Sequence, residues 1–275
     1  MTIIKKLINK IASDLNTEEK SILQALKKRP QAPFDFLMRY QNILKGEIKW
    51  NDLDFNNQIV MELGCGPHLG LGPLALYLGA KKFIAVEPKV DSRVFESKKL
   101  IDNYFRMAFK DFNGIYRKNI SFEEYFNLVK DKTIFYKDIK QVSSSFLSKI
   151  DIQLSNSCLE HVTHLNETLS DLKRLISVDG KFIHAVDFGN HFKSKNPFIE
   201  IYNSSPEKFR SKYGNKINLI HPSKMLRMFF DSGFDNASLV SYYYFKENFE
   251  ENINDHWIKN LEDTDFFLKV GIIAG

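Results

Sequence analysis

The stretch that decides the fold is VMELGCGPHLGLGP, residues 60–73. A short apolar run, Ile59–Leu63, leads into a turn with four glycines, and Pro73 follows where a helix would begin. Glycines let the backbone bend tightly and approach a ligand closely, and the N-terminus of the next helix offers unpaired N–H groups. Open α/β sheets bind nucleotides at such a turn. The segment therefore predicts a bound nucleotide-like cofactor.

The spacing of these glycines disfavours a dinucleotide cofactor. A dinucleotide fingerprint reads G-x-G-x-x-G, so counting from Gly64 the third glycine belongs at position 69, where the chain has Leu69. The strand also ends in the acidic Glu62, whose carboxylate would repel a pyrophosphate. A cofactor that carries positive charge suits this acid better than NAD does.

Beyond the glycine-rich turn, apolar strand-like runs alternate with helical patterns. The predicted strands are Ile59–Leu63, Lys82–Val86, Thr133–Tyr136, Ile150–Leu154, Lys181–Val186, Ala237–Phe245 and Phe266–Ala274. The predicted helices are Pro73–Leu78, Leu159–Ile176 and Lys224–Ser232. Repeated βα units predict an α/β fold with a doubly wound, mostly parallel seven-stranded sheet and helices on both faces.

Three regions exceed what a minimal α/β domain needs, within a single predicted domain over residues 1–275. Residues 1–57 predict an N-terminal helical cap, with helices over 1–29 and 34–44 that pack on the domain rather than on a membrane. Residues 89–131 predict a helical insert rich in Phe and Tyr, which either packs on the domain or covers an acceptor pocket. Residues 188–222 look irregular and are interpreted as a substrate lid.

Composition narrows the function classes. Hydrophobic residues make up 43% of the 275 residues, enough for a sizeable core. No apolar run approaches the ~18 residues of a membrane span, and no secretory signal is recognised, so we expect a cytoplasmic protein without a membrane partner. The formal charge of +5 is scattered, so nucleic acid is not an expected partner. The only cysteines, Cys65 and Cys158, are interpreted as reduced, packed thiols.

Further motifs follow the first in a fixed order. They are FIAVEP (83–88), FYKDI (135–139), DIQLSNSCLEHV (151–162) and DLKRLISVDGKFIHAVD (171–187). Together with the glycine-rich turn they resemble the class I S-adenosylmethionine-dependent methyltransferases. The resemblance covers roughly residues 58–187 well and residues 220–275 weakly.

The resemblance implies that the cofactor is S-adenosylmethionine. It implies that Glu87 binds both ribose hydroxyls and that Asp138 accepts a hydrogen bond from the adenine amino group. One carboxylate can accept two hydrogen bonds from a cis-diol, which suits Glu87. His68 departs from the family, which often has a third glycine there. The remaining implied cofactor contacts are Glu62, Gly64, Gly66, Gly70, Pro88, Ile139 and Asn156.

Methyl transfer to a hydroxyl needs in-line positioning and usually a base. The candidate catalytic residues are His184, Asp187 and His191, at and beyond the end of the fifth predicted strand. Strand alternation places His184 and Asp187 on opposite faces. Each has a simpler alternative: His184 as a buried, hydrogen-bonded histidine, Asp187 as a cap of the next loop, and His191 as an exposed side chain.

A metal site is not predicted. Some family members bind a divalent cation through Glu-x-x-Glu-His after the fourth strand, and the matching residues here are Ser157, Glu160 and His161. Because the first acid is missing, the expected metal content is none.

The sequence as a whole favours a methyltransferase that acts on a hydroxyl of a small-molecule or carbohydrate acceptor. The carbohydrate suggestion comes from the resemblance of HAVDFGNH (184–191) to bacterial surface-sugar methyltransferases. The alternatives are a catalytically silent S-adenosylmethionine-binding protein and, less favoured, an NAD enzyme. The sequence leaves open the acceptor atom, the base, the pathway and the oligomeric state.

Overall fold

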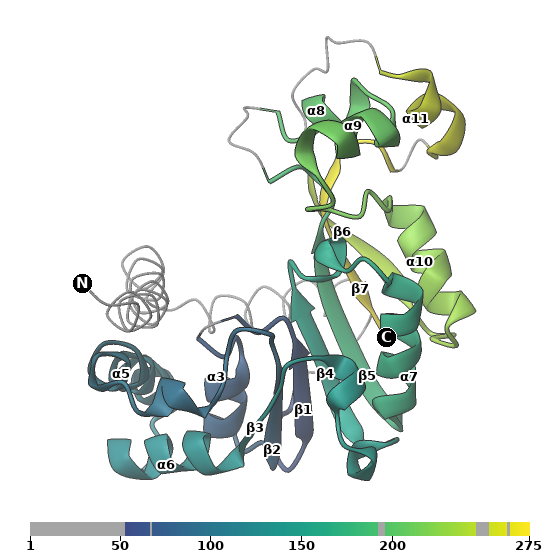
Figure 1. Ribbon diagram of the computed structural model, residues 1–275. Helices are drawn as coiled ribbons and strands as arrows, with labels where there is room; N and C mark the ends of the chain where they lie inside the picture. Colours follow the sequence, from purple (N-terminus) through teal and green to yellow (C-terminus); the bar gives the residue numbers. More distant parts are fainter. Residues whose placement is uncertain (1–52, 67, 192–195, 246–252, 263–264) are drawn as a thin grey trace, which may run out of the picture. The chain divides into compact units, whose positions relative to one another are not determined.

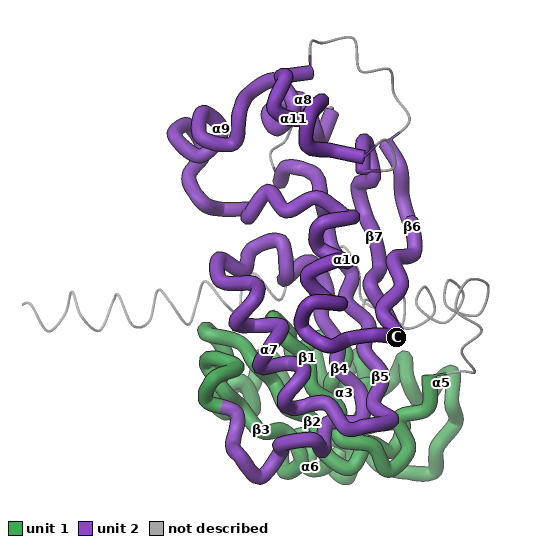
Figure 2. The backbone as a smooth tube through the Cα atoms, turned by 90° about the vertical axis from the view of Figure 1, so that its right-hand side faces the viewer, with its two compact units in different colours: residues 1–42, 53–141 green, residues 43–52, 142–275 purple. Residues whose placement is uncertain are grey.

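The computed structural model describes residues 53–66, 68–191, 196–245, 253–262 and 265–275, coloured by sequence in Figure 1. The predicted helices over 1–29 and 34–44 lie outside these residues. The chain divides into two compact units, with Leu53–Gln141 in unit 1 and Val142–Gly275 in unit 2 (Figure 2). No helix in the described part of the chain is long and apolar enough to cross a membrane.

Seven strands follow the order β3-β2-β1-β4-β5-β7-β6. Unit 1 holds β1 (Ile59–Leu63), β2 (Lys82–Val86) and β3 (Thr133–Tyr136). Unit 2 holds β4 (Ile150–Asn156), β5 (Ile176–Asp187), β6 (Ser238–Tyr244) and β7 (Leu268–Ala274). The pairs β1–β2, β2–β3 and β4–β5 are parallel, whereas β7 runs antiparallel to β5 and β6. The predicted mostly parallel seven-stranded sheet is confirmed.

In unit 1, the glycine-rich turn leads directly into a short buried helix. Helix α3 (Gly72–Tyr77) has Pro73 in its first turn, and all its residues are buried. Gly79 follows it with a φ of 112°, a left-handed value that glycine adopts without strain. The predicted helix Pro73–Leu78 is therefore confirmed to within one residue at each end.

The aromatic insert is helical and packs within unit 1. It contains α4 (Lys98–Leu100), a π-helical turn (Ile101–Phe105), α5 (Arg106–Tyr116) and α6 (Phe122–Lys132). Tyr77 of α3 lies 5.7 Å from Phe112 and 5.9 Å from Tyr125, between ring centroids. Phe95 lies 5.9 Å from Phe135 of β3. The aromatic residues thus form a core on α3 and β3, which is the first of the two expected arrangements.

In unit 2, helices α7 (Leu165–Leu175) and α10 (Pro222–Asp231) pack against each other. The predicted helix Leu159–Ile176 is wrong at both ends. It opens as a separate 3₁₀ turn, Leu159–His161, and Ile176 already belongs to β5. The Asn218 side chain donates to the carbonyls of Leu159 (2.8 Å) and Val162 (3.1 Å), which ends the turn before α7 begins. Ile176 pairs with Ile150 of β4.

The segment predicted to be irregular, residues 188–222, forms part of a second core. Its helices α8 (Ile199–Tyr202) and α9 (Pro206–Tyr213) pack with α11 (Asp255–Asn260). The buried residues of this core are Phe198, Ile201, Tyr202, Phe209, Ile217 and Trp257. The Trp257 indole N–H donates to the carbonyls of Ile201 (2.9 Å) and Ser204 (2.7 Å). A segment about fifty residues further along the chain therefore holds the predicted lid in place.

Candidate functional site

The glycine-rich turn has the backbone conformation that its glycines predict. Gly64, Gly66 and Gly70 all have positive φ, between 48° and 71°, and Leu69 between them adopts a φ of 62°. A side chain at Gly66 would meet nothing within 4 Å. The space beside the second glycine is therefore open to a ligand that approaches the backbone closely.

Glu62 points into this turn. Its side chain is 4% exposed, and its Oε2 accepts a hydrogen bond from the Leu71 N–H at 2.7 Å. A Cβ at Gly70 would lie 2.2 Å from the carboxylate, so a larger residue there would displace Glu62. Burial raises the pKa of Glu62 to about 7, and the bond from Leu71 opposes that rise. Because Leu71 is the N-cap of α3, the acid takes up a donor that a phosphate would otherwise use.

Glu87 follows β2 and reaches the same turn. Its Oε2 accepts from the Gly66 N–H at 3.2 Å, and its Oε1 accepts from the Lys89 N–H at 3.3 Å. The Glu87 N–H donates to the Tyr136 carbonyl at 2.9 Å, which anchors the strand end to β3. An ionised carboxylate has about four acceptor sites, so these bonds leave capacity for a further pair of donors.

Tyr104, in the aromatic insert, also contacts the glycine-rich turn. Its hydroxyl donates to the His68 carbonyl at 2.6 Å, and the ring is 4% exposed. The His68 ring lies 6.0 Å from the Tyr104 ring, and burial lowers the pKa of His68. Within the described residues, Nδ1 of His68 is buried without a hydrogen-bond partner. The residue that departs from the family pattern is therefore fixed by the insert.

The other predicted cofactor residues make contacts typical of ordinary turn and strand residues. Pro88 and Asp138 are exposed, whereas Ile139 is buried. The Asp138 carboxylate accepts from the Lys140 N–H at 2.8 Å, as a turn residue does. Asn156, in unit 2, is the last residue of β4 and pairs with Ala185 of β5.

His184 lies in the interior of unit 2. It has no exposed surface, and its Nδ1 lies 2.8 Å from the Ser155 Oγ. Its ring packs on Phe182 and Phe229, with centroids 6.0 and 5.5 Å away. Burial lowers its pKa to about 3. This placement corresponds to the buried, hydrogen-bonded histidine considered from the sequence.

Asp187, at the end of β5, is held by an ion pair and a loop. Lys269 of β7 donates to both carboxylate oxygens, and the Gly189 N–H donates to Oδ1 at 3.0 Å. The carboxylate therefore caps the loop that follows, as one alternative had it, and is neutralised by Lys269.

His191 lies beside Asp187 and a second acid, Glu160. Its Nε2 is 3.7 Å from Oδ2 of Asp187 and 3.8 Å from Oε1 of Glu160. The His191 side chain is 36% exposed, whereas that of Glu160 is 3% exposed. Burial raises the pKa of Glu160 to about 8, with nearby Asp187 adding to the rise, and burial lowers the pKa of His191. Of the three predicted catalytic residues, the structure brings Asp187 and His191 together.

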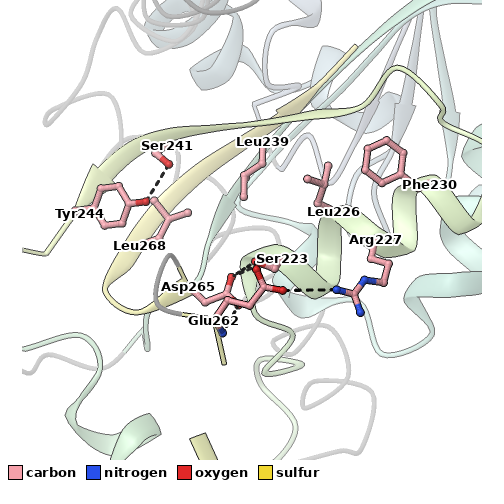
Figure 3. A pocket seen from close by; sticks show the side chains of 10 residues that line it. All are labelled: Ser223, Leu226, Arg227, Phe230, Leu239, Ser241, Tyr244, Glu262, Asp265 and Leu268. Carbon is pink, nitrogen blue, oxygen red and sulfur yellow. Dashed lines mark hydrogen bonds and ion pairs between the residues drawn. The ribbon is translucent and has the colours of Figure 1, made fainter. Parts of the chain in front are cut away.

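A pocket of about 480 Å³ in unit 2 involves other residues. Helix α10, strands β6 and β7 and the segment before β7 line it (Figure 3). Ser223 donates to the buried Asp265 at 2.7 Å through both its N–H and its hydroxyl, while Arg227 lies 3.6 Å from Glu262. None of the predicted site residues lines this pocket.

No protein-family model and no curated protein sequence matches the chain. Solved structures that resemble it include phosphoethanolamine N-methyltransferase 2 of Haemonchus contortus, 13% identical with a TM-score of 0.45, over 72% of this chain and 37% of that one. An S-adenosylmethionine-dependent methyltransferase of Mesorhizobium loti is 12% identical with a TM-score of 0.42, over 81% and 92%.

An arsenic(III) S-adenosylmethionine methyltransferase of Chlamydomonas reinhardtii is 12% identical with a TM-score of 0.42, over 80% of this chain and 62% of that one. The chain thus spans less than two thirds of two of these three neighbours. The structural neighbours are S-adenosylmethionine-dependent methyltransferases with varied acceptors. The acceptors that are named for these proteins are their own.

The sequence alone does not single out Tyr104 as a support of the glycine-rich turn, or Glu160 as a neighbour of Asp187 and His191. Tyr104 is one of many aromatic residues in the insert, and no local pattern separates it from those that only pack. Glu160 stands in the LEHV motif, but its proximity to Asp187 and His191 arises from pairing of β4 with β5. Both roles depend on contacts between segments at least 27 residues apart.

Proposed function

We propose that the protein is an S-adenosylmethionine-dependent methyltransferase whose unit 1 binds the cofactor. The observation that carries this proposal is the arrangement of two carboxylates at one glycine-rich turn, Glu62 within it and Glu87 on its Gly66 N–H. S-adenosylmethionine has a ribose diol that matches the acceptor sites of Glu87, and a sulfonium and an ammonium group that tolerate nearby acids.

The same arrangement disfavours NAD. A pyrophosphate needs unpaired N–H groups at the turn, and Glu62 already takes the one from Leu71. Open space at Gly66 supports close approach of a ligand that does not bring two phosphates. When bound, S-adenosylmethionine supplies an electrophilic methyl group, so the protein must mainly position the acceptor.

We propose that the acceptor is a small hydroxylated molecule, carbohydrates included, and that His191 is the residue of the predicted trio that contacts it. His184 has no exposed surface, and Asp187 is occupied by Lys269 and Gly189. His191 is 36% exposed and has both acids within 3.8 Å. A group of exposed imidazole and buried carboxylates suits recognition of a hydroxyl.

The test is calorimetry with S-adenosylhomocysteine on wild-type protein and on Glu87→Ala. We expect the variant to lose about 2–4 kcal/mol of binding free energy, because two charge-assisted hydrogen bonds are lost. Glu96→Ala, which removes an exposed carboxylate elsewhere in unit 1, is the matched control and should bind as wild type does.

Equal affinity of Glu87→Ala and wild type would refute the ribose role.

A second experiment assays turnover. It measures release of S-adenosylhomocysteine from S-adenosylmethionine in the presence of sugar and metabolite pools. Binding without release in any pool would favour the silent binding protein instead.

A further inference from the structure

Three side chains of unit 2 with metal-binding groups converge near the end of β5. Glu160 and His161 belong to the 3₁₀ turn after β4, and His191 follows β5 by four residues. One ligand atom from each lies within 4.8 Å of the other two. The rings of His161 and His191 meet edge to face, with centroids 4.7 Å apart.

His161 is oriented in the manner of a metal ligand. Its Nδ1 lies 2.5 Å from the Lys216 carbonyl oxygen. A carbonyl only accepts, so Nδ1 carries the proton and Nε2 of the neutral ring has a free lone pair. Metal-ligating histidines commonly donate their other N–H to a carbonyl or carboxylate, which fixes the tautomer and the ring orientation.

Glu160 has an acceptor atom without a partner. Its side chain is 3% exposed, and Oε1 accepts from the Asp187 N–H at 3.4 Å. Oε2 is buried and has no hydrogen-bond partner among the described residues. Its own carbonyl accepts from the Asn218 N–H at 2.7 Å, so the turn is held firmly. A buried carboxyl oxygen without a partner is costly, and a bound cation would give Oε2 that partner.

The charges around the cluster favour a cation. Lys269 offsets Asp187, because its ammonium bonds both carboxylate oxygens. Glu160 is then the remaining acid beside two imidazoles. One carboxylate and two neutral imidazoles are a ligand set that zinc-type ions prefer over magnesium or calcium.

We propose that Glu160, His161 and His191 bind a divalent transition-metal ion of the zinc type. Bond lengths of about 2.0–2.2 Å require the ligand atoms to lie about 3.5 Å apart, so the cluster must contract by about 1 Å. His191 is 36% exposed, so we expect this side chain to make that movement. Three protein ligands leave a coordination position open. That an acceptor hydroxyl occupies this position rests on the proposed function, whereas binding of the ion does not.

The test is titration of the untagged full-length protein, stripped with a chelator, with Co²⁺ followed by visible absorption and with Zn²⁺ followed by calorimetry. We expect one ion per chain. His161→Ala and His191→Asn should each weaken binding by about 100-fold, since even outer partners of metal ligands contribute about 10- to 100-fold. His164→Ala is the control, because His164 is exposed and pairs only weakly with Glu167 at 3.9 Å.

Circular dichroism shows whether the variants remain folded, and S-adenosylhomocysteine affinity is measured on the same samples. Absence of stoichiometric binding by the wild type would overturn the proposal, as would equal binding by folded His161→Ala, His191→Asn and His164→Ala. Cobalt binding without any S-adenosylhomocysteine binding would remove the proposed function and leave the metal site standing.

Discussion

Burial shifts the pKa values of two titratable side chains, Glu62 and His184, in opposite directions. Glu62 gains a higher pKa and His184 a lower one, both because burial disfavours the charged form. Glu62 keeps a backbone donor and lies beside open space at Gly66. His184 is enclosed by aromatic rings. The first is therefore suited to a ligand site and the second to the core.

Glu62 should make the free energy of unfolding fall as pH rises. Its folded pKa is about 7 and its ordinary value 4.5, so between these values the folded state holds a proton that the unfolded state has lost. The contribution of Glu62 to the free energy of unfolding is highest below pH 4.5 and falls as pH rises through 7. A pKa shift from 4.5 to about 7 corresponds to about 3 kcal/mol, because each pKa unit is worth about 1.36 kcal/mol.

Denaturant unfolding without cofactor at pH 5 and pH 8 measures this effect. Glu62→Gln, which retains an oxygen for the Leu71 N–H, should lose about 3 kcal/mol less than wild type over that interval. If both proteins lose the same amount, the carboxyl is not the buried group described.

His184 should matter for stability rather than for chemistry. We expect His184→Ala to lower the free energy of unfolding by about 2–4 kcal/mol, from the cavity and the lost bond to Ser155. His191→Ala, at a half-exposed position, should cost less than about 1 kcal/mol. Urea unfolding of both variants makes the comparison, and equal losses would contradict the placement of His184.

At the scale of elements, the aromatic insert has a role beyond packing. Its α5 and α6 build a core on α3, while Tyr104 from the π-helical turn holds the carbonyl of His68. The residue after His68, Leu69, has a left-handed φ of 62°. The insert therefore supports a strained part of the glycine-rich turn.

Removing that hydroxyl should disturb the turn. We expect Tyr104→Phe to lower stability by about 1–2 kcal/mol, since a buried hydrogen bond is lost, and to weaken S-adenosylhomocysteine binding by up to about tenfold. Tyr125→Phe is the matched control in the same insert, because the Tyr125 hydroxyl is buried without a partner among the described residues. It should be neutral or stabilising. The same cofactor affinity in both variants would show that the insert only packs.

The strands were predictable because short apolar runs between turn residues indicate them directly. Lys82–Val86 and Thr133–Tyr136 have the predicted bounds, and Ile150–Leu154 extends by two residues. The strand predicted over Lys181–Val186 begins five residues earlier, at Ile176. The bounds of the predicted helix Leu159–Ile176 were not predictable, because Asn218, more than fifty residues away, ends its first turn. Local periodicity cannot contain that information.

Part of the candidate site was predictable from the sequence and part was not. The acids at the strand ends, Glu62 and Glu87, follow from the motif, and the structure brings both to the glycine-rich turn. The cluster of Glu160, His161 and His191 could not be predicted from residues 157–161 alone, because His191 lies on the loop after the next strand. Tertiary pairing, not local sequence, completes such a set.

At the scale of the whole molecule, the residues proposed to bind the cofactor and those proposed to bind the acceptor lie in different units. Unit 1 contains the glycine-rich turn, and unit 2 contains the acids and histidines proposed to contact an acceptor and an ion. We propose that the glycine-rich turn binds S-adenosylmethionine and not a dinucleotide. This proposal depends on Glu62 and Glu87, both of which lie in unit 1.

The most direct test is thermal unfolding of the full-length protein with and without S-adenosylhomocysteine or NAD. A ligand at 100 times its Kd stabilises the native state by about 2.7 kcal/mol, so S-adenosylhomocysteine should raise Tm by about 5 °C or more. NAD at the same concentration should leave Tm unchanged. A larger shift with NAD, or no shift with S-adenosylhomocysteine, would show that the turn does not bind S-adenosylmethionine as proposed.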